Sequence, residues 1–114
     1  MDLAGRLEPG RQAFNRGDCY QAHELWEQVW LELAGAERVF VQGLIQIAVG
    51  LHHLQQGRRT PAAGQLRKGL EKIARGVPAA LGHLRIEALA REGARLLADL
   101  AADSIAPAPI TVEL

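Results

Sequence analysis

The sequence predicts an all-α fold, a compact bundle of four to five helices with a central, almost fully apolar third helix. Three observations lead to this expectation. Alternating β-branched residues are missing before the C-terminal tail, and glycine and proline divide the chain into helix-sized segments. Within these segments apolar residues recur every three or four positions, which is the spacing of a helix that buries one face.

The first two helices are expected on either side of a glycine. The first is predicted over residues 9–16, because Pro9 suits the first turn of a helix and Gly17 suits a C-terminal cap. Asp18 can then cap a second helix over residues 19–34, since its carboxylate can accept from the free backbone N–H groups of a first turn.

The third helix is predicted over residues 36–56, after Gly35, and it is apolar almost all round. A helix with that pattern is the one around which the others pack. Gly43 and Gly50 lie seven residues apart and leave one side without side chains. We therefore expect a neighbouring helix to approach closely there.

Two further helices and a tail complete the expected fold. Thr60 and Pro61 are a start signal, a capping hydroxyl followed by a first-turn proline, for a fourth helix that ends near Gly76. A fifth is predicted from His83 or Leu84 to Ala101. Residues 1–104 would then form one helical domain, and residues 105–114, which contain two prolines, an extended tail.

Composition narrows the class of protein. The chain has 114 residues, the length of one domain, and its 13 basic and 13 acidic residues cancel. Nucleic-acid binders usually carry a basic excess, so a nucleic-acid partner is not expected. The most apolar stretch, residues 39–51, is shorter than the ~20 residues of a membrane span. The lone Cys19 cannot form an internal disulfide, and the cytoplasm is the expected location.

A polar cluster is predicted between the second and third helices. His23 and Glu27, one turn apart, share the edge of the apolar face of the second helix. The third helix carries a narrow polar stripe of Gln42, Gln46 and His53. The link between the helices is short, so they should run antiparallel. This sets His23 level with Gln46 or Ile47, and Glu27 level with Gln42 or Gly43. Buried polar groups need partners, so we expect a shared network.

The same residues resemble a known family. The run HELWEQVW at 23–30, followed by RVFVQGLIQIAVGLHHLQQG at 38–57, is similar to the signature of the "domain of unknown function 309" family. The resemblance covers about residues 10–75. It implies a small all-α bundle in a cytosolic protein of unassigned activity, and it identifies no cofactor.

The chemistry of the cluster allows more than one interpretation. The segment from His23 to Glu27 is similar to a His-Glu-x-x-His zinc helix, but the second histidine is replaced by Glu27. His23, Glu27 and His53 could still offer three metal ligands. Glutamine is a poor ligand for transition metals, so a structural polar network or an organic ligand pocket is favoured, and no metal site is assigned. Glu24 belongs to the motif but stands toward solvent.

Two functional hypotheses remain open. The first is a ligand-binding or protein-interaction module, expected to form a homo-oligomer, in which the cluster holds a small polar ligand or sets helix register. Its candidate residues are His23, Glu24, Glu27, Gln42, Gln46 and His53. The alternative is a small metal-dependent or hydrolase-like enzyme that uses the same cluster, with His23 as base or ligand. The sequence does not decide between these two hypotheses, but it favours the first, in which the protein is not an enzyme.

Overall fold

The predicted all-α class is confirmed. The computed structural model describes residues 1–103 and 109–114, and all regular elements in these ranges are helical. In chain order they are α1 (Leu3–Asn15), α2 (Cys19–Trp30), α3 (Gly35–Gln55), α4 (Arg59–Ile73), the 3-10 turn η1 (Ala79–Leu81) and α5 (Ile86–Ala101).

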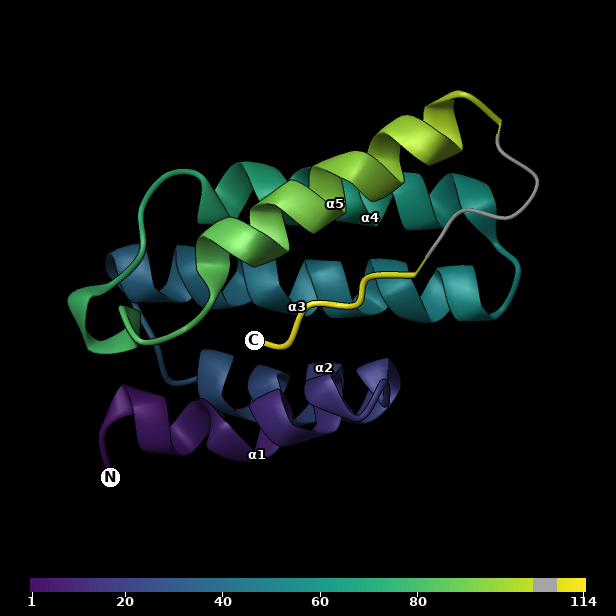
Figure 1. Ribbon diagram of the computed structural model, residues 1–114. Helices are drawn as coiled ribbons and strands as arrows, with labels where there is room; N and C mark the ends of the chain where they lie inside the picture. The colour runs from purple at the N-terminus through teal and green to yellow at the C-terminus, as the bar shows by residue number, and fades with distance from the viewer. Residues whose placement is uncertain (104–108) are drawn as a thin grey trace.

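The central position predicted for the third helix is confirmed. Helices α2 and α4 both pack against α3, α1 packs on α2, and α5 packs on α4 (Figure 1). Three side chains of α3 that reach the core, Phe40, Leu44 and Ile47, are each 1% exposed. The described helices include none that is long and apolar enough to span a membrane.

The first helix begins at Leu3, and the prediction that it starts at Pro9 is wrong. Asp2 caps α1, its side chain accepting from the backbone N–H of Gly5 at 2.8 Å, and Pro9 lies inside the helix. Leu3 and Leu7 are both buried. Burial of these two leucines offsets the hydrogen bond that the interior proline removes.

The second helix ends at Trp30, four residues before the predicted end. Arg38 of α3 donates from Nη1 to the carbonyl oxygen of Leu33 at 3.1 Å and to that of Trp30 at 3.4 Å. Its guanidinium also lies 3.8 Å from the centre of the Trp30 ring. A cation from the next helix thus contacts the last carbonyl of α2 and one carbonyl of the link that follows it, an arrangement that sequence periodicity does not indicate.

The segment before α5 also differs from the prediction. Helix α5 starts at Ile86, not at residue 83 or 84, and the unpredicted turn η1 precedes it. Leu81 of η1 is completely buried. The turn η1 therefore separates α4 from α5 and places one leucine in the core.

The predicted tail is described only in part, since residues 104–108 lie outside the described ranges. Residues 109–114 are not helical and run alongside α3 (Figure 1). Leu114 is 4% exposed, and its backbone N–H donates to Oδ1 of Asn15 at 2.9 Å. The end of the chain thus packs into the helical core.

The expected close approach along the glycines of α3 is confirmed, and the neighbour is α4. A Cβ atom at Gly43 would lie 3.0 Å from the carbonyl oxygen of Gly69, and one at Gly50 would lie 3.1 Å from that of Ala62. Glycine at both positions lets the two helices pack backbone against backbone.

Candidate functional site

An open groove of about 280 Å³ lies on the face where α2 and α4 flank α3. Its lining residues are His23, Glu27 and Trp30 of α2, Gln42, Ile45, Gln46 and Val49 of α3, and Gln65 of α4. Four of the six residues proposed from the sequence therefore meet in one place. Helical spacing placed them on facing edges, and the antiparallel contact of α2 with α3 sets them level.

The imidazole of His23 is held by its own helix. Its Nδ1 lies 2.8 Å from the carbonyl oxygen of Tyr20, to which the Nδ1–H donates, and its Nε2 lies 3.4 Å from Oε2 of Glu27. The His23 side chain is 21% exposed and that of Glu27 is 49% exposed. Both ring nitrogens thus face oxygen acceptors, and the carboxylate remains open to solvent or to a ligand.

A lysine that the sequence analysis did not include contacts one of the groove residues. Lys72 of α4 donates from Nζ to Oε1 of Gln46 at 2.9 Å. The bond fixes the orientation of this amide, because the oxygen must face the lysine and the NH₂ is left to point elsewhere. Lys72 and Gln65 were missed because the sequence argument aligned only α2 with α3. The short link before α4 could have extended the same reasoning to a third helix.

Two proposed residues lie elsewhere. Glu24 is exposed and does not line the groove. His53 is half-buried on α3, also outside the groove lining, and its Nδ1 is buried without a hydrogen-bond partner. His53 lies near the far end of α3, two turns beyond Gln46, which is too far along the axis to share one small groove.

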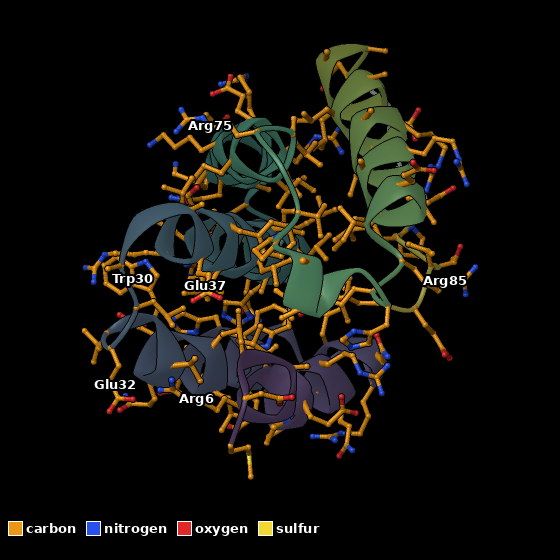
Figure 2. The ribbon with its side chains drawn as sticks, turned by 90° about the vertical axis from the view of Figure 1, so that its left-hand side faces the viewer. Arg6, Trp30, Glu32, Glu37, Arg75 and Arg85 are labelled. Atoms are coloured by element: carbon orange, nitrogen blue, oxygen red, sulfur yellow. The ribbon has the colours of Figure 1, made fainter. Side chains whose placement is uncertain are left out.

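The cluster was expected to be buried, and this expectation needs correction. Among the described residues no polar or charged one is fully buried, and the groove is open. In the end-on view Trp30 lies at the left edge, whereas α5 covers the opposite side of the bundle (Figure 2). The groove stays open because α5 packs on α4 away from this face.

The three metal ligands considered from the sequence do not come together. In the ranges that the structure describes, no three His, Cys, Asp or Glu side chains come together in a way that could hold a metal ion. The combination of His23, Glu27 and His53 weighed from the sequence therefore has no geometric basis, since His53 stands apart from the other two.

Cys19 is expected to be unreactive in the folded protein. Burial raises the pKa of its thiol to about 11, and the thiolate is the reactive form. At pH 8 we expect iodoacetamide to alkylate Cys19 more than about a hundredfold more slowly than in the urea-unfolded chain, where the pKa is near 8.5. The rate should rise about tenfold per pH unit toward pH 10. Equal rates in the two states, measured by mass spectrometry, would contradict a packed thiol.

These features define the class: a small helical bundle with a half-buried polar groove on one face. The chain belongs to the family described as a domain of unknown function (DUF309), whose model matches residues 7–65. That range contains every residue of the groove lining.

The comparison with individual proteins agrees with this family. The chain is similar to an uncharacterized protein of Aquifex aeolicus (strain VF5), with 33% identity over 69 residues. The match covers 60% of this chain and 21% of that protein, so the chain spans about a fifth of its relative's length. No solved structure matches the chain significantly.

Proposed function

We propose that the chain is a binding module and that its groove takes a small polar ligand. The observation that supports this most is the convergence of one imidazole, one carboxylate and three amides around an apolar floor of Ile45 and Val49. Sites for small molecules combine an apolar lining with a few placed polar groups in this way. The volume of about 280 Å³ suits a ligand at the small end of the usual range.

The polar groups suggest the chemistry of the ligand. Side-chain amides both donate and accept hydrogen bonds, and Glu27 offers an acceptor that is half open to solvent. Trp30 adds an indole Nε1 that is buried and has no hydrogen-bond partner. We infer a neutral or cationic molecule with both donors and acceptors, which places an amine or amide N–H toward Glu27.

The catalytic alternative receives less support from these contacts. A hydrolase that uses His23 as base needs Nε2 directed at the substrate, but Nε2 faces the Glu27 carboxylate at 3.4 Å. Among the residues that line the groove there is no serine, threonine or cysteine that could act as a nucleophile. We therefore propose binding without chemistry at this site.

A thermal-shift screen of small neutral and cationic metabolites tests the proposal. A compound present at ten times its Kd should stabilise the protein by about 1.4 kcal/mol and raise Tm by about 5 °C. Replacing Gln42 by leucine removes both hydrogen-bonding functions of one amide and should abolish the shift. The matched control is Gln28→Leu, an exposed position on α2 outside the groove, which should keep it.

Two outcomes would contradict the proposal. One is a set of shifts that Gln42→Leu and Gln28→Leu leave equally unchanged, which would place binding elsewhere. The other is a ligand-free protein that light scattering shows to be a dimer and that Gln42→Leu alters in its association. That result would make this face the surface of the expected homo-oligomer.

A further inference from the structure

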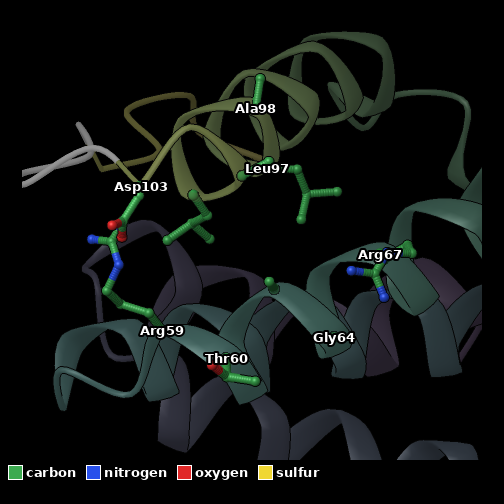
Figure 3. Close-up of a pocket in the computed structure, with 10 residues that line it drawn as sticks. Arg59, Thr60, Gly64, Arg67, Leu97, Ala98 and Asp103 are labelled. Atoms are coloured by element: carbon green, nitrogen blue, oxygen red, sulfur yellow. The ribbon is translucent and has the colours of Figure 1, made fainter.

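A second and larger cavity, of about 730 Å³, lies between the first half of α4 and the last half of α5 (Figure 3). The two helices touch closely at one point, where a Cβ atom at Gly93 would lie 2.8 Å from Leu70. Toward the start of α4 they diverge, and the small residues Ala63, Gly64 and Ala98 leave the space between them open. We call this cavity the wedge.

The wedge combines an apolar wall with cations. Leu97 and Leu100 of α5 line it and are only half-buried. Arg59 and Arg67 of α4 line its opposite side, about two turns apart (Figure 3). Within the described residues Arg67 has no ion-pair partner. Asp103 is the one acidic residue among those that line the wedge.

Arg59 lacks a good partner. Its Nη2 is buried and makes no hydrogen bond, and its contact with Oδ1 of Asp103 is long, at 4.0 Å. Asp103 itself is 97% exposed, so solvent screens the pair and its contribution to stability is small. A buried guanidinium nitrogen without an acceptor is a position where a ligand carboxylate gains a charge-assisted hydrogen bond.

We propose that the wedge binds an anionic amphiphile, a straight-chain carboxylate whose head group pairs with Arg59 and whose alkyl chain lies against Leu97 and Leu100. The carboxylate replaces the loosely held Asp103 as the partner of Arg59. This site is separate from the groove, because α4 uses a different face for each. Helix α5, which supplies the apolar wall of the wedge, lies outside the residues that match the family.

Octanoate is the probe, with binding measured by calorimetry and the site located by amide shifts in NMR spectra. We expect the amides of Leu97 and Leu100 to shift, and each methylene added from hexanoate to decanoate to tighten binding by roughly fourfold. Arg59→Gln should weaken binding by about tenfold or more. The matched control Arg58→Gln makes the same charge change at the adjacent exposed residue and should change affinity by less than about twofold.

Two further comparisons sharpen the test. Asp103→Asn removes the competing carboxylate and should tighten binding, and octanol, which lacks the charge, should bind about as weakly as octanoate binds Arg59→Gln. His23→Asn, in the groove, should leave octanoate binding unchanged, which separates this proposal from the one above.

The proposal is overturned if octanoate leaves the wedge amides of the folded wild-type protein unshifted, or if chain length does not affect affinity. It is also overturned if Arg58→Gln and Arg59→Gln weaken binding equally, because the effect would then be one of net charge. A dimer in which α5 of a second copy covers the wedge would also overturn the proposal, because the wedge would then be a surface between two copies. The chain-length series needs no variant, so it decides the matter even if Arg59→Gln proves unstable.

Discussion

Replacing Trp26 by alanine is expected to lower the free energy of unfolding by about 3–5 kcal/mol. The side chain is 1% exposed, and its Nε1 donates to the carbonyl oxygen of Leu7 at 3.1 Å. The ring lies 5.7 Å from that of Phe14 and rests directly on Gly10, where a Cβ atom would overlap the indole. The substitution therefore opens a large cavity between α1 and α2 and removes the hydrogen bond from the indole to the carbonyl oxygen of Leu7.

The matched control for this prediction is Trp30→Ala, one helical turn away. Trp30 is half-buried, lines the groove and forms no hydrogen bond through Nε1, so its loss should cost about 1–2 kcal/mol. Urea unfolding followed by circular dichroism measures both variants. If the two cost the same, then Trp26 is not the anchor of the contact between α1 and α2.

A second large effect is expected where α3 and α4 meet. Replacing Gly69 by alanine should lower the free energy of unfolding by about 1–3 kcal/mol. A Cβ atom at this position would lie 2.7 Å from the carbonyl oxygen of Gly43 and 2.9 Å from the backbone nitrogen of Ile47. Both are backbone atoms, which cannot rotate away as a side chain can, so the two helices must separate.

Gly64→Ala, in the same helix, is the control. A Cβ atom at Gly64 meets nothing within 4 Å, and alanine favours the helix over glycine by up to about 1 kcal/mol. We therefore expect Gly64→Ala to raise the free energy of unfolding. The same substitution should thus have opposite effects on stability at two positions of α4. Thermal and urea unfolding measure both, and a stabilising Gly69→Ala would show that α3 and α4 pack less closely than described.

The main part of the candidate site could be predicted from local spacing. His23 and Glu27 had to share one edge because residues four apart in a helix lie one above the other. Gln42 and Gln46 follow the same rule, and a short link makes neighbouring helices antiparallel. These two facts place the four side chains together before any packing is considered.

Other parts of the site depended on contacts between distant segments. Gln65 lines the groove, and Lys72 reaches Gln46, because α4 packs along α3 on the side away from α2. The cluster is open and not buried, since the position of α5 decides what is covered. Helix spacing within one segment contains no information on where the fifth helix crosses the fourth, and the wedge was unforeseen for the same reason.

The sequence by itself determined the helical class, the central third helix and the alignment of the polar edges of α2 and α3. These are consequences of periodicity, caps and glycines, which act within one helix or between neighbours in the chain. Only the tertiary structure decided that α1 begins at Leu3, that Arg38 caps α2 and that one face of α3 stays open. The start of α1 and the open face of α3 depend on how distant segments pack, and burial can override the local preference of a proline. The Arg38 contacts depend on how the chain turns between α2 and α3, which periodicity within one helix does not define.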